Sequence, residues 1–198
     1  MLILGITGNI GSGKSTACEI LKGMKGYIIN ADELSHEVIL RGKPAFDEIL
    51  AEVDSNILAD DGEIDRKRLG AIVFSDAEKL KKLTRIVHKY VIEETRGKIG
   101  LIKRNPGEYK FITIDGPLLF EAGMEKLCHY TILVSASEKT RLERVVKRDG
   151  LTFDDARKRS RSRKDTDEYS DAVDFIITND RDFETLNEQV KRCVESLI

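Results

Sequence analysis

Short apolar runs alternate with amphipathic helical stretches along the chain. Residues 2–7 are almost wholly apolar and run into a glycine-rich turn, which predicts a buried strand. From about residue 15 to residue 24 apolar side chains recur every three or four positions, which predicts a helix. The same patterns predict further strands at 27–30, 111–115, 130–134 and 173–178, and further helices at about 76–103, 137–148 and 182–197.

Strands that alternate with helices predict a parallel sheet covered on both faces, an α/β fold of three layers (α/β/α) with five parallel strands. Two stretches lie outside this repeat. One is the helical block between the second and third strands, and the other is an almost wholly polar stretch before the fifth. We therefore expect a core of about 1–30, 108–145 and 171–198, a helical lobe of about 31–107 and a helical lid of about 146–170.

Composition narrows the class of protein. The chain has 198 residues, 40% of them hydrophobic, and 33 basic residues nearly balance 35 acidic ones. This balance favours a packed core over disorder and argues against a general nucleic-acid binder. No apolar run approaches the roughly 20 residues that span a bilayer, and the apolar start lacks the positive charge of a signal peptide.

The three cysteines are far apart in the sequence, so we expect neither disulfides nor a zinc site. They are Cys18, Cys128 and Cys193. Reduced thiols are typical of cytoplasmic proteins. We expect a cytoplasmic monomer or weak oligomer that binds neither nucleic acid nor membrane.

The glycine-rich turn carries the strongest chemical signal. Residues 8–16 read Gly-Asn-Ile-Gly-Ser-Gly-Lys-Ser-Thr and satisfy G-x-x-x-x-G-K-[ST], the phosphate loop. Its backbone amides and the following helix N-terminus attract phosphate, Lys14 supplies a charge for the β- and γ-phosphates, and Ser15 is a ligand for Mg²⁺. The expected nucleotide-binding residues are Gly8, Asn9, Ile10, Gly11, Ser12, Gly13, Lys14, Ser15 and Thr16.

A phosphate loop alone does not say what happens to the phosphate. A GTP-dependent switch needs an N-K-x-D segment after a late strand, and residues 178–181 (Thr-Asn-Asp-Arg) do not fit it. A motor ATPase is usually longer. The size and the two insertions favour a small-molecule kinase of the nucleoside-kinase-like fold. A protein that binds nucleotide without phosphorylating a small acceptor, such as a regulatory ATPase, stays open as the alternative.

Two carboxylates follow strands of the predicted sheet. Asp115 closes the strand 111–115, where carboxylates face the ligand crevice, and is a candidate Mg²⁺ ligand. Asp32 follows the strand 27–30, which we expect beside the strand that delivers the phosphate loop. Asp32 is a candidate acceptor for the proton of an attacking hydroxyl. Alternatively it is an N-cap or first-turn residue, stabilised by the helix dipole.

Basic residues gather before the fifth strand. Ten basic residues face four acidic ones between positions 141 and 164. Arg141, Arg144 and Arg148 are spaced three and four apart and share a helix face. An arginine in a lid stabilises the charge on a transferring phosphoryl group, and we assign Arg144 and Arg148 this role. For 157–164 a solvated or nucleic-acid-binding face remains the alternative.

With these residues the chain resembles the dephospho-coenzyme A kinase family over nearly its whole length. The resemblance rests on residues 5–16, 29–32, 41–45, 65–69, 87–88, 115–121, 144–149 and 173–179. The segment Asp-Gly-Pro-Leu-Leu-Phe-Glu at 115–121 and the Ala-Asp at 31–32 are the most specific. The resemblance implies transfer of the ATP γ-phosphate to the ribose 3′-hydroxyl of dephospho-coenzyme A, the last step of coenzyme A synthesis.

The resemblance also implies roles for individual residues. Asp32 resembles the base or metal-linked carboxylate at the attacking hydroxyl, and Arg144 and Arg148 resemble the lid pair. The lobe of about 31–107 resembles the helical lobe that binds the acceptor in this family. Asn179 falls where the adenine-side loop of the family begins. The residues that resemble the acceptor pocket are Arg66, His88, Pro117, Leu118 and Leu119.

Three positions depart from the family pattern. Asn30 stands where the family often has a second aspartate, so it brings no charge to a metal. Lys89 follows His88, where the family usually has proline. Arg163 stands where the lid often has glutamine. The last two departures concern the lobe and the lid more than the reaction.

Overall fold

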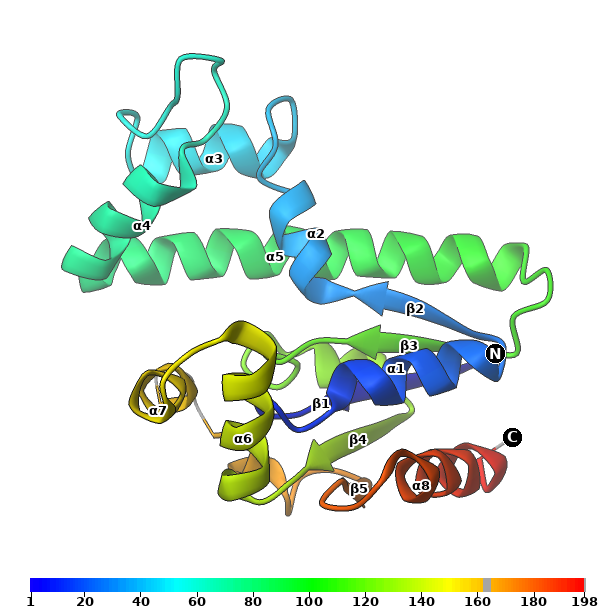
Figure 1. The fold of residues 1–198 in the computed structure, drawn as a ribbon. Coiled ribbons are helices and arrows are strands. Elements are labelled where there is room, and N and C mark those ends of the chain that lie inside the picture. The colour runs from blue at the N-terminus through cyan, green and yellow to red at the C-terminus, as the bar shows by residue number, and fades with distance from the viewer. Residues whose placement is uncertain (162–164, 198) are drawn as a thin grey trace. The chain divides into compact units, whose positions relative to one another are not determined.

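The computed structural model describes residues 1–161 and 165–197, so Arg163 lies outside the described residues. The chain divides into two compact units (Figure 1). Unit 1 comprises Met1–Ile29 and Ile102–Ile198, and unit 2 comprises Asn30–Leu101. Unit 2 falls within the lobe expected from the sequence at 31–107, apart from its first residue. The described part of the predicted lid belongs to unit 1 together with the core.

Over the described residues five strands form one sheet in the order β2-β3-β1-β4-β5. The pairs β1–β3, β1–β4 and β4–β5 are parallel, as the alternation of strands and helices predicts. The strands are β1 (Leu2–Thr7), β2 (Gly26–Asn30), β3 (Phe111–Asp115), β4 (Tyr130–Ser135) and β5 (Phe175–Thr178).

The strand order corrects one expectation. β2 pairs with β3, so the expectation that it lies beside the strand of the phosphate loop is wrong. β3 takes the place next to β1, with Ile6 opposite Asp115. All five positions of β3 are buried, whereas β2 is buried at only two. A strand buried on both faces belongs inside a parallel sheet, and the half-buried strand lies at the edge.

The last strand is shorter than predicted. β5 begins at Phe175, two residues after the predicted start. The carboxylate of Asp174 accepts hydrogen bonds from the amide of Thr131, at 2.7 Å, and from its hydroxyl, at 2.8 Å. The amide of Thr131 therefore donates to a side chain, while the amide of Asp174 still donates to the carbonyl of Thr131 at 3.2 Å.

In unit 1, α1 (Lys14–Gly23) and α8 (Phe183–Glu195) pack against each other and against the sheet (Figure 1). Their shared core includes Leu4 and Ile6 of β1 and Phe111 of β3. The polar stretch predicted as a lid contains helix, because α6 (Glu138–Asp149) is followed by α7 (Phe153–Arg161) and by a 3₁₀ turn, η2 (Thr166–Tyr169). Another 3₁₀ turn, η1 (Met124–Leu127), precedes β4.

Unit 2 is helical. It contains α2 (Ala31–Glu37), α3 (Pro44–Glu52), α4 (Arg66–Ser75) and most of α5 (Ala77–Arg104), close to the long helix predicted from periodicity. Asp65 caps α4 by accepting from the amides of Lys67 and Arg68. Among the described residues no helix is both long enough and apolar enough to cross a membrane.

Candidate active site

The phosphate loop joins β1 to α1 and presents backbone amides. Gly11 and Gly13 have φ angles of 80° and 93°, in the left-handed region that side chains other than hydrogen disfavour. Gly13 is the N-cap of α1, so it has no side chain that could accept from the first-turn amides. The first turn of α1 carries no acidic residue. An anion at this helix end is therefore stabilised by uncapped amides and by the helix dipole.

Asn179 braces the loop from the end of β5. Its amide nitrogen donates to the carbonyl of Ser12 at 2.8 Å, and the residue is 6% exposed. A Cβ atom at Gly13 would lie 2.1 Å from the same nitrogen, so only glycine fits. Arg144 completes the cluster by donating to the carbonyl of Gly11 at 3.4 Å and to the side-chain oxygen of Asn179 at 3.5 Å.

Lys14 and Asp115 form an ion pair at the base of the loop. The Lys14 and Asp115 side chains are 16% and 10% exposed. β3 pairs with β1 in parallel, and this register carries its last residue, Asp115, to the strand end from which the loop departs. Cys18 lies one turn after Lys14. Burial, and secondarily the Asp115 carboxylate, raise the pKa of its thiol far above the ordinary value, so it remains protonated.

The arginines predicted to share a face of α6 have different partners. Arg141 is 7% exposed, and its Nε donates to the carbonyl of Ala136 at 3.0 Å. Arg148 is exposed and binds both carboxylate oxygens of Asp149, at 2.7 and 2.9 Å. The hydrogen bonds from Arg148 hold the pKa of Asp149 below its usual range. Arg144 thus lies on the phosphate loop, whereas Arg148 is engaged by its neighbour.

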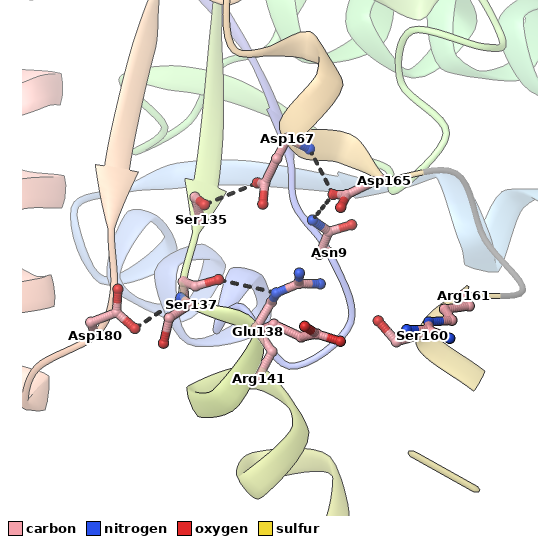
Figure 2. A pocket seen from close by; sticks show the side chains of 11 residues that line it. Asn9, Ser135, Ser137, Glu138, Arg141, Ser160, Arg161, Asp165, Asp167 and Asp180 are labelled. Carbon is pink, nitrogen blue, oxygen red and sulfur yellow. Dashed lines mark hydrogen bonds between the residues drawn. The ribbon is translucent and has the colours of Figure 1, made fainter. Parts of the chain in front are cut away.

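A cavity of about 610 Å³ lies in unit 1 beside the loop (Figure 2). Side chains of both charges line it, including Arg141, Asp165 and Asp180. The carboxylate of Asp180 accepts from the amide of Ser137 at 2.9 Å. Asn9 of the phosphate loop also lines this polar cavity, so the cavity adjoins the loop.

Two leucines of the segment after β3 are predicted to line the acceptor pocket, and they differ in solvent exposure. Leu118 is 43% exposed, whereas Leu119 is fully buried and packs beneath Gly5 of β1. Leu119 is thus a core residue, and Leu118 is the leucine that can contact a ligand directly. Pro117 is half-buried, and its carbonyl accepts from the hydroxyl of Thr7 at 3.4 Å.

In unit 2 the structure separates the roles of Asn30 and Asp32. The side-chain oxygen of Asn30 accepts from the amides of Asp32, at 3.0 Å, and Glu33, at 3.3 Å, so Asn30 is the N-cap of α2. Asp32 lies in the first turn and is exposed. Its carboxylate is not needed to cap the helix. Asp32 is therefore a first-turn residue of α2 and not its N-cap.

The other predicted residues of unit 2 lie on two helices. Arg66 is the exposed first residue of α4, and His88 is half-buried in α5. Lys89 donates to Glu48 of α3 at 2.9 Å, and Tyr90 donates to the same carboxylate at 2.7 Å. Lys89 therefore ties α5 to α3, and lysine suits the interior of a helix better than the proline that the resemblance leads one to expect.

Comparison with known proteins identifies the family. The model of the family described as dephospho-CoA kinase matches residues 2–185. The chain belongs to the dephospho-CoA kinase family. Among curated members, the dephospho-CoA kinase of Carboxydothermus hydrogenoformans is 37% identical over 188 residues, covering 95% of this chain and 90% of the relative. That of Aquifex aeolicus is 34% identical over 194 residues, covering 98% and 96%.

Solved structures agree with this assignment. A Thermus thermophilus protein, TT1252, superposes with a TM-score of 0.78 at 30% identity, covering 100% of this chain and 98% of that one. A dephospho-CoA kinase from Campylobacter jejuni has a TM-score of 0.70 at 26% identity, covering 98% and 96%. A shikimate kinase from Bacteroides thetaiotaomicron, 13% identical with a TM-score of 0.53, shares the fold alone. The predicted family and the three-layer α/β/α fold with a phosphate loop are confirmed.

Sequence reasoning missed one part of the site of this dephospho-CoA kinase family member. The side chain of Asn9 donates to Asp165 at 2.5 Å and accepts from the amide of Thr166 at 3.0 Å. The partners are more than 150 positions apart, so no local pattern reveals the contact. The pairing of Arg148 with Asp149 could have been found from the sequence, because the two residues are neighbours with opposite charges.

Proposed function

We propose that this chain is a dephospho-CoA kinase, which transfers the γ-phosphate of ATP to the ribose 3′-hydroxyl of 3′-dephospho-CoA and yields CoA and ADP. This is the final step of CoA biosynthesis. The observation that carries the proposal is the family match over residues 2–185, which includes the phosphate loop, Asp32 and Asp115. The curated relatives of this length are themselves dephospho-CoA kinases.

The transfer is a displacement at phosphorus. The 3′-oxygen forms a bond to the γ-phosphorus, the bond from that phosphorus to the bridging oxygen breaks, and ADP leaves with the electron pair. The proton of the 3′-hydroxyl goes to the carboxylate of Asp32, the general base in this proposal. The exposure of Asp32 supports this role, because an acceptor hydroxyl can reach its carboxylate.

The loop and the arginines bind the phosphates of ATP. Uncapped amides of residues 8–16 surround them, and Lys14 supplies a charge at the β- and γ-phosphates. Arg144 already lies against the loop through Gly11. Arg148 has to leave Asp149 before it can reach the transferring group, so we assign it to the closed lid.

Residues suited to Mg²⁺ lie at the base of the loop. The Ser15 hydroxyl and the Asp115 carboxylate are oxygen ligands, the kind Mg²⁺ prefers, and Mg²⁺ typically binds one or two carboxylates plus substrate phosphates and water. When bound, Mg²⁺ would neutralise charge on the phosphate oxygens. Asp115 would then exchange its partner, Lys14, for the ion.

We assign the remaining residues to the two substrates. Arg66, His88, Pro117 and Leu118 contact dephospho-CoA, and the buried Leu119 shapes the segment from beneath. We assign Asn179 to ATP binding. It lies in the predicted adenine-side segment, and its hydrogen bond to the carbonyl of Ser12 supports the phosphate loop.

The test is ADP release from Mg·ATP with separate acceptors: dephospho-CoA, nucleoside monophosphates, shikimate and none. We expect release with dephospho-CoA only, and a product with the mass and 3′-phosphate of CoA by mass spectrometry and NMR. ADP release that is independent of acceptor would support a phosphate-loop ATPase instead and would refute the kinase proposal.

We further propose that the enzyme works in the cytoplasm as a monomer or weak oligomer, without nucleic acid or membrane. A net charge of −2 and three free cysteines, Cys18, Cys128 and Cys193, support this setting. Light scattering during size-exclusion chromatography at two concentrations measures the oligomeric state. A stable assembly of constant mass above the monomer would contradict the proposal.

A further inference from the structure

Asn9, the second residue of the phosphate loop, has its side chain bound to the far end of the predicted lid. Its amide nitrogen donates to the carboxylate of Asp165, and its side-chain oxygen accepts from the amide of Thr166 at 3.0 Å. Figure 2 shows the Asn9 amide directed at Asp165. Both polar atoms of this side chain are thus used by the lid, while its backbone belongs to the loop.

The next residue of the loop, Ile10, contacts a cluster that joins the end of the core to the lid. It packs against a buried cluster formed by Leu142 and Val145 of α6 and Ala156 of α7. These three residues are at most 2% exposed. Two successive side chains of the loop therefore contact the lid or the helix that leads into it, Asn9 through polar contacts and Ile10 through apolar ones.

We call Asp165–Tyr169 the return segment, because it leads from the lid back to the core. Other contacts of this segment also lie in unit 1. Ser135 at the end of β4 donates to Asp167 at 2.9 Å, and the Tyr169 ring stacks on Phe120 at a centroid distance of 4.5 Å. The segment is consequently fixed to the sheet independently of the loop, and the Asn9 link adds a connection to the phosphate site itself.

The Asn9 link is charge-assisted. Burial alone would raise the pKa of Asp165, but the amide of Asp167, the Asn9 side chain and the charge of Arg141 together hold it below its usual range. An ionised carboxylate accepts a stronger hydrogen bond than a neutral group. The link therefore orients the Asn9 side chain firmly at neutral pH.

We propose that Asn9 is a positioning residue, which couples the phosphate loop to the lid so that the lid is correctly placed when phosphates occupy the loop. The inference rests on the proposed kinase function. A lid excludes water from the γ-phosphate and completes the site around it. Loosening the link leaves the backbone amides that bind ATP intact, but it misplaces the lid, so water competes with the 3′-hydroxyl.

The first test measures ADP and CoA separately for Asn9→Ala. We expect the KM for ATP to stay within about threefold, kcat for CoA formation to fall about tenfold or more, and the ratio of ADP to CoA to rise above one. A purely structural role would lower the unfolding temperature without changing this ratio. An unchanged kcat and ratio would overturn the proposal. A large rise in KM at unchanged kcat would do so too, because Asn9 would then be a simple ATP ligand.

The second test exchanges the partners. Asn9→Asp places a carboxylate opposite Asp165, and we expect it to impair CoA formation more than Asn9→Ala does. In Asn9→Asp/Asp165→Asn the new asparagine donates to the new aspartate, which still accepts from the Thr166 amide. We expect this pair to restore kcat to within about threefold of wild type. A double variant no better than Asn9→Asp would refute the pairwise link.

Ser135→Ala is the matched control. It removes another tie of the same return segment, the one to Asp167, without touching the phosphate loop. We expect an ADP to CoA ratio near that of wild type. Equal uncoupling in Ser135→Ala and Asn9→Ala would overturn the assignment to the loop. The wild-type protein in the same assay tests the proposed function separately, because a failure there to form CoA would refute the kinase activity itself.

Discussion

Replacing Lys14 by alanine removes a charge from a buried pair as well as from the phosphate site. The Asp115 carboxylate that it leaves behind belongs to a residue only 7% exposed. Removing one partner of a buried pair costs about 3–5 kcal/mol, a large share of the roughly 5–15 kcal/mol that stabilise a domain. The structure therefore predicts a marked loss of stability in Lys14→Ala.

The catalytic effect is separate from this loss. Lys14 is the charge proposed to meet the β- and γ-phosphates, where negative charge is distributed in the transition state. Loss of one preorganised donor at such a position typically lowers kcat by about 10² to 10³. We expect at least this decrease in the folded fraction of Lys14→Ala.

A double variant distinguishes the two effects. Lys14→Ala/Asp115→Asn removes both charges, so no buried carboxylate remains unpaired. We expect urea unfolding to recover most of the lost stability, while CoA formation stays as low as in the single variant or lower. Wild-type turnover in a folded Lys14→Ala protein would refute the role of Lys14. A double variant as unstable as the single one would refute the account of the buried pair.

Three further predictions concern the acceptor side, the lid and unit 2. Asp32→Asn should lower kcat by about 10² to 10⁴. It should change the free energy of unfolding by no more than about 1 kcal/mol, because Asn30 caps α2. Steady-state kinetics and urea unfolding measure the two effects, and near-normal activity would contradict the assignment of Asp32 as the base. Arg148→Ala should lower kcat by about 10² or more while calorimetry finds dephospho-CoA binding little changed; weakened binding at unchanged kcat would remove Arg148 from the lid role. Hydrogen bonds from Lys89, then Tyr90, lower the pKa of Glu48 from 4.5, so its stabilisation is present above pH 4.5 and is lost as the pH falls through the lowered pKa. Urea unfolding of Glu48→Gln should therefore show a deficit at pH 7 that disappears in acid, and a deficit independent of pH would contradict this.

Local patterns predicted the elements that local forces determine. The apolar run of β1, the phosphate loop and the long helix α5 all lie close to their predicted positions, because side-chain periodicity and glycine-rich turns act over a few residues. The order of the strands depends instead on how completely each strand is buried. β2 therefore lies at the sheet edge next to β3, although the sequence suggested a place beside β1.

Within the site, the sequence predicted which residues gather at the loop better than it predicted which residues they contact. Lys14, Asp115 and Asn179 gather at the loop, as a common sheet edge predicts. The contact of Asn9 with the return segment joins parts of the chain more than 150 positions apart, and burial of Leu119 beneath Gly5 depends on packing between neighbouring strands. Such contacts follow from the tertiary fold, so periodicity and motifs contain no information about them.

The departure at Asn30 shows how a missing charge can leave the fold unaffected. Asparagine and aspartate are about equally good N-caps, and Asn30 uses its side-chain oxygen for the amides of Asp32 and Glu33. Its amide nitrogen also donates to the Glu33 carboxylate at 2.9 Å, which aspartate could not do. Asparagine at this position therefore preserves the start of α2 and adds a hydrogen bond to Glu33, while it brings no charge to a metal. Because Asn30 caps the helix, the exposed carboxylate of Asp32 is not used as a cap and can accept a proton. Among Asn30, Asp32 and Glu33, the proposed proton transfer depends on Asp32 alone.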